Sequence, residues 1–239
     1  MKLRVMILSF FMILMAANGQ AGLLGDFIKG LSSPGVSSPD AQTTASGLKE
    51  ALTVGAEKAV GLLSREDGYF ENHMVKILVP KQIQKVADVL VKVGYRQQVD
   101  EFVLSMNRAA EAAAPQAKDI FVSAVRQMTF EEAINILRGD QTAATEYLKS
   151  KTYSSLADRF NPIIAEAMDN YDVTRRYESL IGTYSKTLPF INLESLDLNR
   201  YVTNKALDGV FYMIGEEEKE IRANPAARVT DLLKTVFGG

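Results

Sequence analysis

The stretch SGLKEALTVGAEKAVGLL, residues 46–63, decides the fold of this chain. Its apolar side chains recur at intervals of three and four residues, which is the period of an amphipathic α-helix. Ser46 is a favourable N-cap residue, and Asp67 with Gly68 would end the helix. The apolar positions are Leu48, Ala51, Leu52, Ala56, Ala59, Val60 and Leu63. We therefore expect a buried helix at the start of the folded domain.

The same period continues along the rest of the chain, with residues that start, cap and end helices at suitable positions. Pro80 suits a first helical position, Gly94 suits a left-handed cap, and Thr129 with Glu132 forms a capping box. Further helices are expected at about 80–94, 97–114, 115–128, 129–138, 141–160, 161–171, 174–187 and 198–222, with a closing helix after Pro225. The fold class is therefore all-α, an irregular multi-helix single domain over residues 46–239, with at most one short extended segment near 75–79.

The first 21 residues have the pattern of a secretory signal peptide. Lys2 and Arg4 form a basic tip, an apolar run covers residues 5–17, and small residues precede a cleavage point after Ala21. The run is too short to cross a bilayer, which needs about 20 apolar residues. We expect export to the periplasm by a cleavable signal peptide.

A short apolar piece and a Ser/Pro-rich linker follow the signal peptide over residues 22–45. The linker composition cannot bury enough apolar surface to offset the entropy of ordering it. Residues 22–31 are apolar enough either to pack on the domain or to make peripheral contact with a membrane. Such contact would leave the protein at the membrane surface rather than across it.

The composition excludes several classes of protein. Lys and Arg number 27 against 29 Asp and Glu, and loss of the signal peptide makes the balance more acidic. Nucleic acid requires a clustered excess of cations, so no nucleic-acid partner is expected. The chain has no cysteine, which excludes disulfides and the lipid anchor of a bacterial lipoprotein. No later run is long and apolar enough to span a membrane, so we expect no transmembrane segment in the mature chain.

Several distinctive segments are spread along the chain. They are GLKEAL at 47–52, NRAAE at 107–111, MTF at 128–130, ILRG at 136–139, AAT at 143–145, YVTNKALDGVF at 201–211 and EEKEIRANPAAR at 217–228. Together they resemble a bacterial domain-of-unknown-function family, number 4197, over about residues 46–238. The resemblance implies an exported helical protein of Gram-negative bacteria, with no established activity. Members of the family sometimes carry a lipobox cysteine, and this chain departs from that pattern.

A metal centre or cofactor is not expected. His73 is the only histidine, and without cysteine a zinc site would rest almost wholly on carboxylates. In the acidic run at 216–220, only pairs such as Glu216 and Glu220 share a helix face. Glycine-rich phosphate loops and the nucleophile elbow of hydrolases are absent. The sequence predicts no catalytic residue, no metal ligand and no cofactor.

The first candidate ligand-binding residues lie on the alanine-rich helix. Asn107 and Glu111 are four residues apart and share a face, with Arg108 beside them. They would either line a pocket or form a buried hydrogen-bond network that fixes the helix register.

The late helix carries further candidates. Lys205 and Asp208 lie three residues apart, with the same two interpretations. Glu217 falls near the edge of the apolar stripe, between Met213 and Ile221, where a carboxylate needs a partner. All three are included among the candidate ligand-binding residues.

The sharpest polar cluster consists of Arg222, Asn224, Arg228 and Thr230. Two guanidinium groups beside a helix start suit a phosphate or carboxylate ligand. The alternative is that the arginines pair with acids and fix the closing helix in place. The candidate partners are Glu217, Glu218 and Asp231.

Three functions remain open at this point. The favoured one is a helical binding or interaction module for a small apolar or anionic ligand or a partner protein of the envelope. A hydrolase-type enzyme would use Glu111, Asp208 and Glu217 in an interhelical cleft, with Arg222 and Arg228 holding an anion. A structural cell-envelope protein is the third. Acids gathered in one pocket would favour the enzyme, whereas an apolar cleft or patch would favour the binding module.

Overall fold

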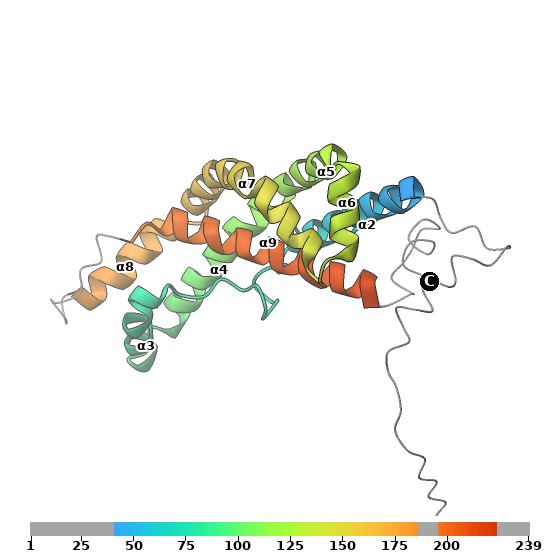
Figure 1. Ribbon diagram of the computed structural model, residues 1–239. Helices are drawn as coiled ribbons and strands as arrows, with labels where there is room; N and C mark the ends of the chain where they lie inside the picture. The colour runs from blue at the N-terminus through green and yellow to red at the C-terminus, as the bar shows by residue number, and fades with distance from the viewer. Residues whose placement is uncertain (1–40, 186–195, 224–239) are drawn as a thin grey trace, which may run out of the picture. The chain divides into compact units, whose positions relative to one another are not determined.

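The computed structural model describes residues 41–185 and 196–223, and every regular element within them is helical (Figure 1). The α-helices are α2 (Ala41–Leu63), α3 (Gln84–Lys92), α4 (Arg96–Ala113), α5 (Ala117–Gln127), α6 (Phe130–Arg138), α7 (Ala143–Asn170), α8 (Val173–Ser185) and α9 (Leu198–Ala223). Short 3₁₀ turns, η1 (Lys81–Ile83) and η2 (Ala114–Gln116), precede α3 and α5. The all-α class is confirmed. Among the described helices, none has the length and apolar character that crossing a membrane would require.

Several expectations concern residues outside the described ranges. They are the signal peptide over 1–21, the apolar piece over 22–31, the linker up to residue 40 and the closing helix after Pro225. They remain predictions.

Long helices α7 and α9 form the centre of the described domain, and α2 and α4 pack against them (Figure 1). The apolar stripes of these helices meet in one core, as their period predicts. Ala112 of the alanine-rich helix α4 is exposed, whereas three other alanines of this helix are fully buried. They are Ala109, Ala110 and Ala113. Small side chains at this surface let the backbones of neighbouring helices come close without leaving voids.

Residues that cap or break helices predicted most helix ends correctly. Thr129 and Glu132 form the expected capping box at the start of α6. Gly94, after α3, has a φ of 102°, the left-handed conformation that glycine adopts most easily. The first described helix starts earlier than expected, at Ala41 instead of Ser46, so Ser46 lies inside α2.

The break expected near residue 160 is wrong, because α7 runs through Pro162 without interruption. Proline removes one backbone donor and crowds the preceding turn, which usually bends or ends a helix. Here the ring lies on the exposed side of α7, while Phe160 and Ile164 are fully buried on the other. The continuous apolar stripe holds both halves of the helix against the core.

No strand forms in the described residues, and the segment expected near 75–79 is irregular backbone. Ile77 and Val79 are buried and Leu78 between them is exposed, the alternation of an extended chain. Hydrogen bonds from side chains hold the backbone of this segment, in place of pairing with a neighbouring strand. Asn107 bonds to both the N–H and the carbonyl of Ile77, and the Tyr201 hydroxyl donates to the Leu78 carbonyl.

Alanine substitutions at two glycines are expected to change stability in opposite directions. A Cβ at Gly209 would lie 2.7 Å from the buried Tyr69 ring, so Gly209→Ala should cost about 1 to 3 kcal/mol of unfolding free energy. A Cβ at exposed Gly61 meets nothing within 4 Å, so Gly61→Ala should add about 0.5 to 1 kcal/mol through helix propensity. Urea denaturation measures both. A stabilised Gly209→Ala variant would contradict the packing described.

The capping box of α6 is expected to stabilise the fold in a pH-dependent way. The backbone N–H of Thr129 and the ammonium of Lys151 lower the pKa of Glu132 from 4.5 to about 2. Because the folded-state pKa lies below the unfolded-state value, the stabilisation is present above about pH 4.5 and is lost as the pH falls toward 2. We expect Glu132→Gln to be less stable than wild type at pH 7 and equally stable near pH 2. A difference that persists undiminished at pH 2 would rule out the carboxylate as its cause.

Candidate functional site

Asn107 lies on α4 with its side-chain amide buried and engaged by the fold. Its Oδ1 accepts the N–H of Ile77 at 2.8 Å, and its Nδ2 donates to the carbonyls of Ile77 and Val103 at 2.8 and 2.7 Å. These bonds hold the 76–80 segment against α4. Of the two interpretations of Asn107, the contacts favour the buried network.

Glu111 is a buried carboxylate, 5% exposed, that ties the turn after α2 to α4. Its Oε1 accepts the N–H groups of Tyr69 and Phe70 at 3.0 and 3.2 Å, and its Oε2 accepts Nη1 of Arg108 at 2.6 Å. A further nitrogen of Arg108 bonds to Asp67 at 2.7 Å. Burial acts to lower the pKa of Arg108, but the hydrogen bonds to Glu111 and Asp67 outweigh it and raise that pKa.

Arg108 and Glu111 also line an open cleft of about 460 Å³, the Arg108 cleft. Its lining residues are Ser64, Glu66, Arg108, Glu111, Ala112, Pro115 and Tyr171. Ser64 and Tyr171 directly follow the C-terminal ends of α2 and α7, whose carbonyl groups add negative potential. Arg108 already meets three carboxylates, those of Glu66, Asp67 and Glu111. An added anion at Arg108 would therefore compete with resident acids.

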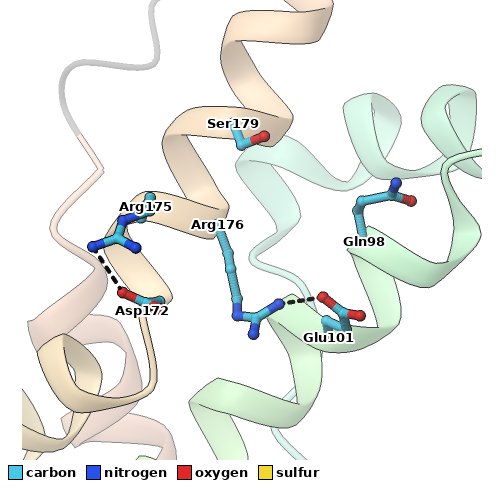
Figure 2. A pocket seen from close by; sticks show the side chains of 6 residues that line it. All are labelled: Gln98, Glu101, Asp172, Arg175, Arg176 and Ser179. Atoms are coloured by element: carbon cyan, nitrogen blue, oxygen red, sulfur yellow. Dashed lines mark hydrogen bonds and ion pairs between the residues drawn. The ribbon is translucent and has the colours of Figure 1, made fainter.

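A second cleft, of about 300 Å³, opens between α4 and α8 (Figure 2). We call it the Arg176 cleft, and its lining residues are Gln98, Glu101, Asp172, Arg175, Arg176 and Ser179. Arg176 extends from α8 to an ion pair with Glu101 on α4, whereas Arg175 turns toward Asp172, with 3.2 Å between Nη2 and Oδ1 (Figure 2). A hydrogen bond from Gln97 and the contact with Arg176 lower the pKa of Glu101, which keeps it ionised.

The two clefts lie along one face of α4. Glu101 and Arg108 are seven residues apart on this helix, which places them on the same side about two turns from each other. The consecutive residues Tyr171 and Asp172, which join α7 to α8, line one cleft each. We call the two clefts together the α4 groove. It brings together charged groups that the sequence places far apart.

Glu218 on α9 is a buried carboxylate that fastens the start of α7. It accepts the N–H groups of Ala144 and Thr145 at 3.0 and 2.8 Å and the Thr145 hydroxyl at 2.8 Å. Thr142, the residue at the N-cap position of α7, makes no side-chain cap. Glu218 supplies from another helix the acceptor that the first turn needs, at the positive end of the helix dipole.

Arg222 completes this cluster. Its Nε donates to Oε1 of Glu218 at 3.0 Å, and its Nη2 donates to the carbonyl of Ile136 at 3.0 Å. This is the pairing with an acid that the sequence left open as the alternative to anion binding. Asn224, Arg228 and Thr230, the other members of the predicted cluster, lie outside the described residues.

The acids considered for catalysis are not brought together. Glu111 belongs to α4, whereas Asp208 and Glu217 belong to α9, and each has its own cationic partner. Asp208 pairs with Lys205 at 3.0 Å on the exposed face of α9. Glu217 pairs with Lys58 on α2 at 2.7 Å, the partner that its place beside the apolar stripe required.

No metal site emerges from the described part of the chain, where His, Asp and Glu form no group of three or more able to hold an ion. His73 is exposed in the turn before the irregular segment. Further open clefts between α5 and α7 are lined by Asp119, Ile120 and Ser155 among others, and contain none of the predicted site residues.

Sequence reasoning missed the residues of the Arg176 cleft. Glu101 and Arg176 are separated by 75 positions, and neither belongs to a motif. They come together because α4 packs against α8, which the sequence does not indicate. The sequence pattern indicates Glu218 only as a partner for Arg222 or Arg228, although its spacing from Ile214 and Ile221 places it on the buried stripe.

These features define an all-helical domain that has open polar clefts between its helices and buried carboxylates fastening its turns. The chain belongs to the family described as protein of unknown function (DUF4197), whose model matches residues 38–238. The resemblance noted from the sequence is therefore confirmed. Searches of curated proteins and of solved structures gave no match.

Proposed function

We propose that this protein is an exported interaction module of the Gram-negative cell envelope that receives a segment of a partner protein in its α4 groove. The observation that carries the proposal is the presence of two open clefts with charged linings along one face of α4. The exposed ion pairs of the Arg176 cleft can exchange partners at little cost, because surface pairs contribute little to stability. A partner with complementary charges would gain orientation and specificity from such a surface.

The shape and chemistry of the groove favour a protein segment over a small apolar ligand. Small-molecule sites are concave, enclose most of the ligand and are lined mainly by apolar side chains. The α4 groove is open, and most residues of the Arg176 cleft are charged. The dispersal of Glu111, Asp208 and Glu217 likewise supports a binding role over hydrolysis by paired carboxylates.

The periplasmic location rests on the signal-peptide pattern of residues 1–21. Cell fractionation followed by mass spectrometry of the purified protein tests it. We expect a periplasmic protein whose first residue is Gly22. A cytoplasmic protein that retains Met1 to Ala21 would overturn this part of the proposal.

Site-specific photo-crosslinking in intact cells tests the binding surface. A photoreactive amino acid replaces exposed Gln98, which lines the Arg176 cleft, or exposed Glu131 on α6, which lines neither cleft of the groove. We expect one adduct of defined mass from position 98 and none from position 131. Equal labelling at both positions, or labelling only at 131, would contradict the proposal.

A further inference from the structure

Two consecutive arginines of α8 line the Arg176 cleft and point in different directions, Arg176 toward Glu101 and Arg175 away from it toward Asp172 (Figure 2). Arg176 is anchored at two points, because its Nε donates to the carbonyl of Tyr171 at 3.3 Å and its Nη1 contacts Glu101. Arg175 has a single contact, 3.2 Å from Asp172, and its side chain is 80% exposed. One arginine is therefore positioned by the fold, and the other is held only weakly.

Both guanidinium groups retain donors for a ligand. Each guanidinium carries five N–H donors in a planar fork that matches the two oxygens of a carboxylate. Among the described residues, Nη2 of Arg176 donates no hydrogen bond, and neither does the side-chain amide of Gln98 across the cleft. The cleft thus presents donors from both α4 and α8.

We propose that Arg175 and Arg176 receive a carboxylate from the partner segment, either an acidic side chain or a free C-terminus. This inference rests on the proposed function, since it assigns the chemistry recognised at one end of the α4 groove. The incoming carboxylate replaces Asp172 on Arg175, while Arg176 stays anchored to Glu101. The exchange swaps one ion pair for another and leaves the fold intact.

Asp172 then acts as a competitor for the site. Its backbone has a φ of 55°, a left-handed conformation that asparagine tolerates as well as aspartate. Asp172→Asn therefore removes the competing charge without straining the turn. This variant should bind the carboxylate more tightly, the opposite of what loss of a structural residue would do.

The chain contains a matched control at the start of α9. Asp197 and Arg200 form the same pairing across three residues as Asp172 and Arg175, and both arginines are similarly exposed. Arg200 is followed by Tyr201, whereas Arg175 is followed by a second arginine, Arg176. Arg200 does not line the Arg176 cleft. Arg200→Gln therefore removes an equivalent exposed charge at a helix start while leaving the cleft unchanged.

Titration of the full chain with N-acetylglycine, followed by ¹⁵N NMR, tests the inference. N-acetylglycine presents a peptide-like carboxylate, and N-acetylglycinamide is its neutral counterpart. We expect saturable shifts at residues 98 and 173–176 with the acid only, weakened by added salt. Arg175→Gln should weaken binding about tenfold, Asp172→Asn should strengthen it, and Arg200→Gln should leave it unchanged. Circular dichroism verifies that each variant is folded.

Three results of the titration would overturn the carboxylate assignment, and a fourth comes from comparison with phosphate. They are shifts that do not saturate, an equal response to the neutral amide, and equal losses in Arg175→Gln and Arg200→Gln. Tighter binding of inorganic phosphate than of the carboxylate would also overturn it. Crosslinking from position 98 is independent of the anion, so an adduct there together with a failed titration would reject the carboxylate and keep the groove.

Discussion

Replacing Glu218 with alanine is expected to lower the free energy of unfolding by about 4 kcal/mol, the largest effect of any single substitution considered. The carboxylate accepts two backbone N–H groups at the start of α7 and the hydroxyl of Thr145, and it also pairs with Arg222. Alanine removes the acceptor of all these hydrogen bonds at once and leaves the largely buried guanidinium of Arg222 without its carboxylate partner. Breaking a buried ion pair from one side typically costs about 3 to 5 kcal/mol.

Glu216→Ala is the matched control for this prediction. Glu216 lies on the same helix and forms an exposed ion pair with Lys219 at 2.8 Å. Exposed pairs contribute about 0 to 1 kcal/mol, so this variant should unfold nearly as wild type does. Urea denaturation of both variants provides the comparison. Equal stability of Glu218→Ala and Glu216→Ala would show that Glu218 does not cap α7.

Glu111→Ala is expected to cost about 3 kcal/mol of unfolding free energy. It leaves the N–H groups of Tyr69 and Phe70 and the side chain of Arg108 without their buried acceptor. The loss is somewhat smaller than at Glu218, because Arg108 keeps its contacts with Asp67 and Glu66.

Asp100→Ala provides the reference for Glu111→Ala, because Asp100 is an exposed acid on the same helix. Its replacement should change stability by no more than about 0.5 kcal/mol. Thermal unfolding followed by circular dichroism measures both variants. If Glu111→Ala were as stable as Asp100→Ala, the turn after α2 would not depend on the buried carboxylate.

Helix positions followed from signals that are local in the sequence. The capping box at Thr129, the left-handed Gly94 and the apolar stripe of α9 each depend on residues within a few positions of one another. Pro162 was misjudged because a proline signals a helix start locally, whereas the buried stripe on both sides of it decided the outcome. Tertiary packing outweighed local preference there.

The candidate site was predictable only in part. The spacing of Asn107 and Glu111 correctly placed both on α4, and the structure shows both in a buried hydrogen-bond network. The sequence pattern singles out Glu217, at the edge of the apolar stripe, and not Glu218. One residue along a helix rotates the side chain by about 100 degrees, and this step places Glu218 in the core. The Arg176 cleft joins residues 75 positions apart, and no periodicity encodes which helices will pack.

The central claim is that the α4 groove is the binding face, while the buried carboxylates serve the fold. Amide hydrogen exchange tests it most directly, measured on the tagged chain in a periplasmic extract and again on the purified chain. We expect the extract to slow exchange at residues 96–104 and 171–180, which border the Arg176 cleft, and to leave α6 unchanged. Slowed exchange confined to the surface between α5 and α7, or no slowing anywhere, would contradict the account.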